Sequence, residues 1–297
     1  MNDQAQSLRR QIGLRDQAAT RRARLVTVTS GKGGVGKSNF TLNFALSLQR
    51  RGSRVLVFDA DFGLANLDLL MGMRPEYTLY HLLKKQKTMR EIVHTGPEGL
   101  PFVAGGSGFT ELVRLSEADL DEFSAQIAEL AVQMDYILFD TGAGLSRETL
   151  KFIVSADETI VVTTPEPTSV TDAYAIMKMI KSHQYDVHYR LVINRVTSER
   201  EGKTTADNIV LAAQRFLGVK VEPLGFVYDD PHVPKAVKKQ VPFTIEYPHC
   251  AAAKGAGDIA ERFLSGTPSD RPSGGMRGFL QRMTRMLLKD SENANRR

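Results

Sequence analysis

Cysteine is almost absent from this sequence of 297 residues, which contains only Cys250. A single thiol per chain excludes an intrachain disulfide, a Cys-x-x-Cys redox pair and a zinc or iron–sulfur site built from several thiolates of one chain. An uninterrupted apolar run of about 18 residues is also missing, so no membrane-spanning helix is expected. The amino-terminal end lacks the apolar stretch of a signal peptide, and we therefore expect a cytoplasmic protein.

Positive charge is concentrated at the two ends of the chain. The net charge is +5, and residues 1–24 and 276–297 each carry +4, which leaves −3 for the long middle. Two short basic segments on a mildly acidic body indicate that the ends meet anionic partners. Tails that only increase solubility are the alternative.

The middle of the chain has the composition of an ordinary folded protein, with 42% hydrophobic and 25% charged residues. Short apolar, β-branched runs alternate there with helical patterns. This predicts an α/β fold with a mostly parallel twisted sheet and helices on both faces. The expected strands are Leu25–Thr29, Arg54–Phe58, Tyr136–Phe139, Thr159–Thr163, Leu191–Ile193 and Leu224–Val227. The expected helices run from about Lys37 to Gly52 and over Glu117–Gln133, Val170–Lys181, Thr205–Leu217 and Ala252–Phe263.

The strongest motif follows the first expected strand and opens the first expected helix. It matches the P-loop pattern G-x-x-x-x-G-K-[ST] and consists of Gly31, Lys32, Gly33, Gly34, Val35, Gly36, Lys37 and Ser38. The glycines let backbone N–H groups surround phosphate oxygens, Lys37 neutralises the β- and γ-phosphates, and Ser38 can ligate Mg²⁺. A glycine turn without a ligand is the alternative, but the complete spacing between strand and helix favours a P-loop NTPase.

Three acidic residues at strand ends are candidates for the metal and water positions. Asp140 ends an apolar strand and precedes Gly142, whereas Asp59 and Asp61 leave the end of another strand. An acidic residue at the carboxyl end of a strand can hold Mg²⁺ through water. We assign Asp140 and Asp59 to the metal side together with Ser38, and Asp61 to the attacking water. A helix cap or a polar turn is the alternative for each.

With these residues the chain resembles the deviant Walker A ATPases of the MinD/ParA group, over roughly residues 25–264. In that group two monomers hold ATP between them, and a lysine after the first glycine of the loop reaches the partner's nucleotide. The resemblance implies ATP or ADP with Mg²⁺ as cofactors, an ATP-dependent homodimer, and slow hydrolysis stimulated by dimerisation or membrane binding. It also implies that Lys32 is the lysine that crosses the dimer and that Asn194 contacts adenine. Asn39, directly after the motif, is included in the nucleotide-binding set.

The first residues are similar to the DQAxxLR motif of one branch of this group, the flagellar-number regulators of the FlhG type (also called FleN or YlxH). In that branch the segment activates a FlhF-type GTPase. The resemblance therefore implies that Asp3, Gln4, Ala5, Leu8 and Arg9 bind this partner, with Gln4 orienting an attacking water, as a glutamine does in other GTPases. It implies flagellar switch (C-ring) proteins as further partners. A disordered basic leader is the alternative by composition.

The last segment, residues 276–297, has the pattern of a basic amphipathic helix with a tail, behind a flexible linker at 265–275. Its apolar residues recur at spacings of three and four and are Met276, Phe279, Leu280, Met283, Met286 and Leu287. Arg277, Arg282, Arg285 and Lys289 lie among its polar positions. This pattern is typical of helices that bind anionic lipids. A terminal helix docked on the body gives the same apolar stripe, but the linker and the basic residues favour the membrane.

The sequence therefore predicts a membrane-cycling ATPase that regulates flagellar placement or number. We expect a dimer with ATP on the cytoplasmic face of the membrane, where two anchors raise the avidity, and a cytoplasmic monomer after hydrolysis. Two other classes stay open. A DNA-partitioning ATPase of the ParA class would bind DNA with a steep salt dependence, although we expect no nucleic-acid partner. A nucleotide-gated adaptor would dimerise with ATP but release no phosphate.

Overall fold

The structure is a computed structural model and describes residues 23–61, 66–106, 117–266, 275–276, 278–283 and 286, without the side chains of 117–121 and 124. The residues expected to bind the GTPase partner, and most of the expected linker, lie outside these ranges. No helix of the described part is long and apolar enough to cross a membrane.

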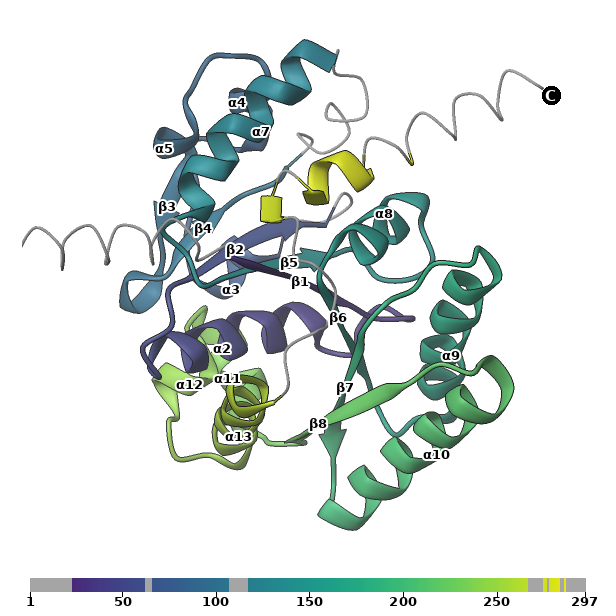
Figure 1. Cartoon of the computed structure of the whole chain (residues 1–297). Coiled ribbons are helices and arrows are strands. Elements are labelled where there is room, and N and C mark those ends of the chain that lie inside the picture. The colour runs from purple at the N-terminus through teal and green to yellow at the C-terminus, as the bar shows by residue number, and fades with distance from the viewer. Residues whose placement is uncertain are drawn as a thin grey trace, which may run out of the picture.

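Eight strands form one sheet in the order β3-β4-β2-β5-β1-β6-β7-β8 (Figure 1). Neighbouring strands are parallel except for β3 and β4, which form an antiparallel hairpin at one edge. The predicted parallel sheet is confirmed, whereas the edge hairpin was not predicted because its strands are only three residues long. The strands are β1 (Arg24–Thr29), β2 (Val55–Ala60), β3 (Val93–Thr95), β4 (Pro101–Val103), β5 (Tyr136–Thr141), β6 (Glu158–Thr163), β7 (Tyr189–Val196) and β8 (Val221–Tyr228).

Helices cover both faces of the sheet, as the continuous apolar strands predicted. Along β1, Val26 and Val28 pack in one core cluster and Leu25 in another, because successive side chains of a strand point to opposite faces. The helices on the Val26 face are α2 (Lys37–Gln49), α11 (His232–Lys239), α12 (Phe243–Glu246) and α13 (Ala251–Ser265). Those packed on the opposite face are α7 (Glu117–Ala131), α8 (Arg147–Ser155), α9 (Pro167–Ser182) and α10 (Glu199–Leu217). The short elements are α3 (Leu67–Leu70), α4 (Leu79–Leu83), α5 (Met89–Ile92) and the 3₁₀ turn η1 (Pro97–Gly99).

Helix α2 begins directly after the glycine loop, as its sequence predicted. Gly36 has a φ of 89° in the left-handed region, which turns the chain from the loop into the helix. Phe40, Phe44 and Leu48 are all buried against the sheet as expected. Phe44 also meets Phe263 of α13 edge to face, with ring centroids 5.3 Å apart. Since α13 covers its outer side, α2 is held rigidly under the phosphate loop.

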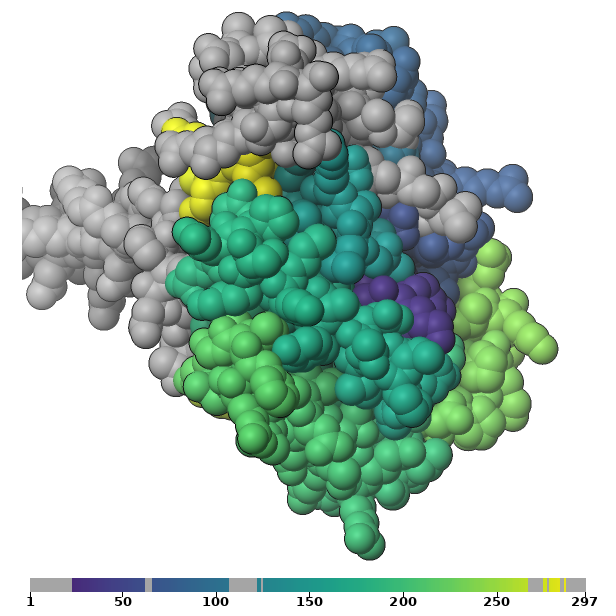
Figure 2. Space-filling view, turned by 90° about the vertical axis from the view of Figure 1, so that its right-hand side faces the viewer, coloured from purple at the N-terminus to yellow at the C-terminus, as the bar shows by residue number. Residues whose placement is uncertain are grey.

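The terminal helix, formed by residues 275–286 where they are described, is docked on the body. Its side chains Met276, Phe279, Leu280 and Met283 are buried in one core cluster with side chains of α7 and α8. The ring of Phe279 stacks on Phe139 of β5, with centroids 4.7 Å apart and an angle of 4° between the planes. Figure 2 shows the yellow terminal residues lying directly against the teal surface of the middle of the chain.

In this structure the apolar stripe of the terminal helix faces the body, which is the docked alternative, and binding of the helix to lipid stays a prediction. Spacings of three and four residues suit a protein core as well as a bilayer, and Phe139 and Phe152 supply an aromatic groove that the sequence pattern does not reveal. A polar contact adds to the packing, because Arg282 donates from Nε to the carbonyl oxygen of Ser155 at 3.0 Å. Leu287, also expected to face lipid, lies outside the described residues.

Replacement of Phe279 by alanine is expected to loosen the terminal helix. Core Phe→Ala changes cost about 3–5 kcal/mol. Because the helix contributes no strand to the sheet, we expect the loss to fall mainly on its docking and to change the Tm of the body only slightly. Limited proteolysis should cut Phe279→Ala after residue 266 several times faster than the wild type. The control is Leu211→Ala on α10, whose side chain is 64% exposed; equal cleavage of the two variants would contradict the docking.

Candidate nucleotide site

The predicted site residues gather at one edge of the sheet. Parallel strands bring their carboxyl ends to the same side, and here β1 leads into the glycine loop while β2 and β5 each carry an acidic residue one position before their ends. Asp59 of β2 lies opposite Asp140 of β5 in the strand register. Both side chains point to the face that carries α2, because they alternate with Phe58 and Phe139, which pack on the other face. Motifs that are separated in the sequence thus come together in one cluster of side chains.

The loop geometry depends on glycine at two positions where another residue would collide. A Cβ at Gly36 would lie 2.4 Å from Nδ2 of Asn194, and a Cβ at Gly31 would lie 2.4 Å from the backbone of Asp172. Asn194 uses that approach to donate from Nδ2 to the carbonyl oxygen of Val35 at 2.7 Å. The structure therefore places Asn194 against the loop itself, at the pocket edge where base contact is predicted.

Lys37 and Asp140 form a buried ion pair. Their side chains are 6% and 1% exposed, and Lys37 Nζ donates to Asp140 Oδ1 at 2.9 Å. The same nitrogen lies 3.2 Å from the Ser38 hydroxyl. The predicted phosphate lysine and two predicted metal-side residues therefore meet at one point, which can receive the phosphates of a nucleotide together with a cation.

Asp59 lies beside this pair and is buried almost completely. Burial, and then the negative charge of Asp140, raise its pKa from 3.8 to about 7. Its oxygens accept hydrogen bonds from backbone N–H groups, Oδ1 from Asp61 at 3.2 Å and Oδ2 from Asn66 and Leu67 at 3.2 and 3.3 Å. The carboxylate thus also holds the turn into α3, which is the structural role weighed as the alternative.

The donors at this point fit Mg²⁺. They are hard oxygen ligands, the Ser38 hydroxyl and the carboxyl groups of Asp140 and Asp59, which are the donors that Mg²⁺ prefers. Among the described residues no group of three or more His, Cys, Asp or Glu is arranged for a metal. Mg²⁺ would therefore depend on nucleotide phosphates as well as on Ser38, Asp140 and Asp59, and when bound it would neutralise charge on the phosphoryl group.

The loop after β5 lies across the site from Asp61. A Cβ at Gly142 would be 3.4 Å from Asp61 Oδ1, so the predicted water-positioning carboxylate faces this loop. The N–H of Gly144 donates to the carbonyl oxygen of Ser30 at 2.8 Å, which ties the same loop to the start of the P-loop. A carboxylate beside flexible glycines at the phosphate edge has the placement needed to orient a water, and this role for Asp61 stays a prediction.

The side chain of Lys32 does not lie with Lys37, Ser38 and Asp140 at the expected phosphate position. Its Nζ donates to Glu166 Oε2 at 3.3 Å and to Thr168 Oγ1 at 3.2 Å, at the start of α9. Both charged side chains are well exposed, so the pair contributes little to stability. The role of Lys32 across a dimer stays a prediction.

A cavity of about 880 Å³ opens next to the loop and is large enough for a nucleoside. The segment 225–250, expected to wall the base side, supplies much of its lining, and Asn39 and Asn194 also lie on it. Lys32, Gly33 and Gly34 of the glycine loop are exposed to solvent. The lining residues are Gly36, Asn39, Phe40, Thr164, Pro165, Glu166, Asn194, Arg195, Glu201, Val227, Tyr228, Asp229, Asp230, Val233, Pro234, Val237, Lys238 and Phe243.

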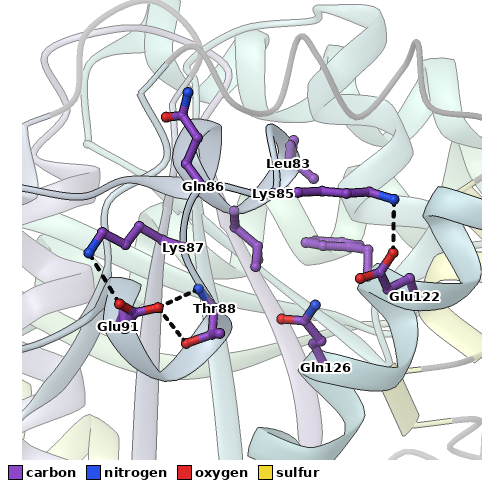
Figure 3. A pocket seen from close by; sticks show the side chains of 10 residues that line it. Leu83, Lys85, Gln86, Lys87, Thr88, Glu91, Glu122 and Gln126 are labelled. Carbon is purple, nitrogen blue, oxygen red and sulfur yellow. Dashed lines mark hydrogen bonds and ion pairs between the residues drawn. The ribbon is translucent and has the colours of Figure 1, made fainter.

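A second cavity, of about 200 Å³, lies between α4, α5 and α7 (Figure 3). Its charges neutralise one another, since Lys85 pairs with Glu122 at 3.0 Å and Lys87 with Glu91 at 3.1 Å. It offers neither a glycine loop nor an unbalanced positive charge for phosphate. The larger cavity, beside the P-loop, is therefore the candidate nucleotide site.

Sequence reasoning missed three residues that support the site. Thr41 donates to Asp140 Oδ1 at 2.8 Å, Thr149 contacts the carbonyl oxygen of Gly142 at 3.4 Å, and Glu166 holds Lys32. Thr41 was open to prediction, because it follows Lys37 by one helical turn and so shares its face. Glu166 lies 134 residues from Lys32, a separation that no local pattern records. Thr149 is only seven residues from Gly142, but their contact depends on how the loop after β5 folds back onto the start of α8.

Comparison with known proteins agrees with this geometry. The model of the CobQ/CobB/MinD/ParA nucleotide binding domain matches residues 26–243, and the chain belongs to this family as a MinD/ParA-type ATPase. Antiactivator FleN of Pseudomonas aeruginosa is 32% identical over 259 residues, which are 87% of this chain and 92% of FleN. The flagellum site-determining protein YlxH of Helicobacter pylori is 32% identical over 269 residues, 89% of this chain and 90% of YlxH. The septum site-determining protein MinD of Pyrococcus horikoshii, solved with Mg-ADP, shares the fold with a TM-score of 0.66 at 24% identity, covering 82% of this chain and 98% of that one.

Nucleotide-free protein is expected to lose stability as the pH rises through the pKa of Asp59. That pKa is about 7 in the folded protein against 3.8 ordinarily, so between these values the folded state keeps a proton that the unfolded chain has released. The free energy of unfolding should fall by up to about 1.4 kcal/mol per pH unit over this window. Asp59→Asn should remove this contribution.

The check is denaturant unfolding of both proteins without Mg²⁺, at about pH 5 and about pH 7.5. The variant should gain stability relative to the wild type at the higher pH. A difference in unfolding free energy that is the same at both pH values would contradict the buried, protonated carboxyl group.

Proposed function

We propose that this ATPase regulates flagellar placement or number in a bacterium and stimulates a FlhF-type GTPase. The observation that carries the proposal is the amino-terminal Asp3-Gln4-Ala5-Gln6-Ser7-Leu8-Arg9 segment joined to a MinD/ParA body. Two relatives at 32% identity over most of the chain support it, one named an antiactivator and one named for the flagellum site. Flagellar switch proteins are the further partners that this function requires.

The ATP-bound form of the proposed regulator is a dimer. Lys32 lies at the open rim of the nucleotide cavity and engages only Glu166 and Thr168 there among the contacts described. An exposed cation at this rim can reach a nucleotide held by a second copy, as the family resemblance implies. Hydrolysis, with Asp61 orienting the water, would then return the dimer to monomers.

Membrane binding by the terminal helix requires that helix to leave the body. Phe279 and its apolar neighbours cannot face the core and a bilayer together. Since lipid tails are about as apolar as a protein core, the exchange is decided by the polar contacts. Arg282 holds the helix to Ser155 and pairs with Asp157 at 3.6 Å, whereas anionic headgroups attract each basic residue by about 1 kcal/mol. A dimer carries two such helices, and their combined avidity favours the membrane. A monomer carries only one, so its helix favours the docked position.

Helix α8 supports a link between nucleotide state and helix release. At its start, Ser146 accepts a hydrogen bond from the N–H of Thr149 at 3.0 Å, and Thr149 reaches Gly142 in the loop that faces Asp61. At its end, Ser155 accepts the hydrogen bond from Arg282. A movement of the glycine loop on nucleotide binding therefore acts directly on the element that holds the terminal helix.

The replacement Gln4→Ala is expected to abolish stimulation of a FlhF-type GTPase without changing the ATPase rate. Gln17→Ala is a matched control, because Asp16-Gln17-Ala18 repeats the start of the motif but Arg21 stands where the motif has leucine. The measurement is GTP turnover by the partner at saturating amounts of each variant. Full stimulation by Gln4→Ala would exclude the proposed role of Gln4.

ATP is expected to increase co-sedimentation with anionic liposomes relative to ADP. Deleting the helix would expose Phe139 and Phe152 and cause nonspecific pelleting, so we change its charge instead. Arg277→Gln, Arg285→Gln and Lys289→Gln together should weaken lipid binding by roughly a hundredfold, because each charge contributes about 1 kcal/mol. Neutralising the exposed body lysines Lys203, Lys220 and Lys254 is the control.

Equal lipid binding by the two triple variants would contradict membrane attachment through the terminal helix. Pelleting with DNA in place of lipid, with a steep loss at higher salt, would move the protein to the DNA-partitioning class. ATP-dependent dimers that release no phosphate, even with lipid and the GTPase present, would identify a nucleotide-gated adaptor.

A further inference from the structure

One oxygen of Asp140 receives two hydrogen bonds from helix α2. Lys37 Nζ approaches Oδ1 at 2.9 Å, and the Thr41 hydroxyl approaches the same atom at 2.8 Å. The carboxylate is 1% exposed and the side chain of Thr41 is fully buried, so water does not replace either partner. Asp140 thus owes its orientation to two residues of one helix, only one of which is part of the P-loop motif.

The Thr41 hydroxyl has one proton and two acceptors within reach. Besides Asp140 it lies 3.0 Å from the carbonyl oxygen of Lys37, one turn earlier in α2. That second contact is the ordinary back-bond of a helical threonine and weakly disfavours the helix. A hydrogen bond to a charged carboxylate is shorter and about twice as strong as a neutral one. The hydroxyl is therefore directed to Asp140.

Nucleotide binding changes the partners of Asp140. The Lys37 ammonium is the cation of the P-loop and is needed at the nucleotide phosphates. Once Lys37 engages the phosphates, it shares its charge between them and the carboxylate or leaves the carboxylate altogether. A buried carboxylate beside Asp59 then needs another fixed donor, because an unpaired buried charge is strongly unfavourable.

We propose that Thr41 is a positioning residue that keeps the Asp140 carboxylate in place when Lys37 turns to the nucleotide. It does not touch the nucleotide. By occupying Oδ1 from a rigid helix, its hydroxyl leaves Oδ2 oriented for the metal side of the site. The inference rests on the ATPase family and on the metal-side role predicted for Asp140, and it is independent of the flagellar function.

The test compares Thr41→Val, which keeps the shape but removes the hydroxyl, with Thr41→Ser, which keeps the hydroxyl. Affinity for a fluorescent ATP analogue is measured over a Mg²⁺ series and again with excess chelator. Loss of a residue that orients a metal ligand typically lowers metal affinity by about 10–100-fold. We expect Thr41→Val to raise by about tenfold the Mg²⁺ concentration that gives half of the increase in nucleotide affinity. Thr41→Ser should stay close to the wild type. The nucleotide affinities measured without Mg²⁺ should be unchanged in all variants.

The control is Thr27→Val on β1, where a buried hydroxyl donates to the carbonyl oxygen of Phe152 at 3.1 Å on the opposite face of the sheet. It should lower the Tm but leave the Mg²⁺ dependence unchanged. Should Thr41→Val fail to fold, Thr41→Ala gives the same reading with a smaller side chain. A Mg²⁺ half-effect in the Val or Ala variant within about twofold of the wild type, or a Ser variant as impaired as Val, would overturn the proposal.

Discussion

The buried ion pair between Lys37 and Asp140 is the interaction on which the phosphate edge depends. It joins α2 to the central strand β5 and neutralises two charges that burial would otherwise make very unfavourable. Asp59 and the Ser38 hydroxyl are arranged around it, and the negative charge of Asp140 helps to keep Asp59 protonated near neutral pH. A nucleotide with its cation can replace this pair because it brings the same two charges, phosphate for the lysine and metal for the carboxylates.

The apolar stripe of the terminal helix illustrates a second constraint, that the same apolar surface suits either a protein core or the proposed bilayer. Packing against Phe139 removes the apolar side chains of the helix from water without a membrane. The basic residues therefore affect where the helix lies and do not drive its folding. The proposed move to a membrane would exchange one apolar environment for another. The polar contacts of Arg282 would then help to decide between the two locations.

The sequence predicted those parts of the site that depend on the spacing of residues close together in the chain. The glycine loop, the helix after it and the strand-ending Asp59 and Asp140 all follow from patterns of fewer than ten residues, and they are observed together. The sequence could not decide the place of Phe279, because its helical period is the same for core and lipid. It also missed the contact between Lys32 and Glu166, which joins residues far apart in the chain. The features that the sequence did not predict are therefore contacts between residues far apart in the chain, which the periodicity of a sequence does not encode.

Strand β5 presents neighbouring residues to opposite sides of the molecule. Asp140 points to the phosphate side and Phe139, one residue earlier, points into the stack with Phe279. A strand hydrogen-bonded on both edges, as β5 is by β1 and β2, resists bending and slides only as a unit. A shift of Asp140 along the strand would therefore also move Phe139 and its stack with Phe279 on the far face. Two neighbouring residues of β5 thus connect the phosphate site with the docking site of the terminal helix.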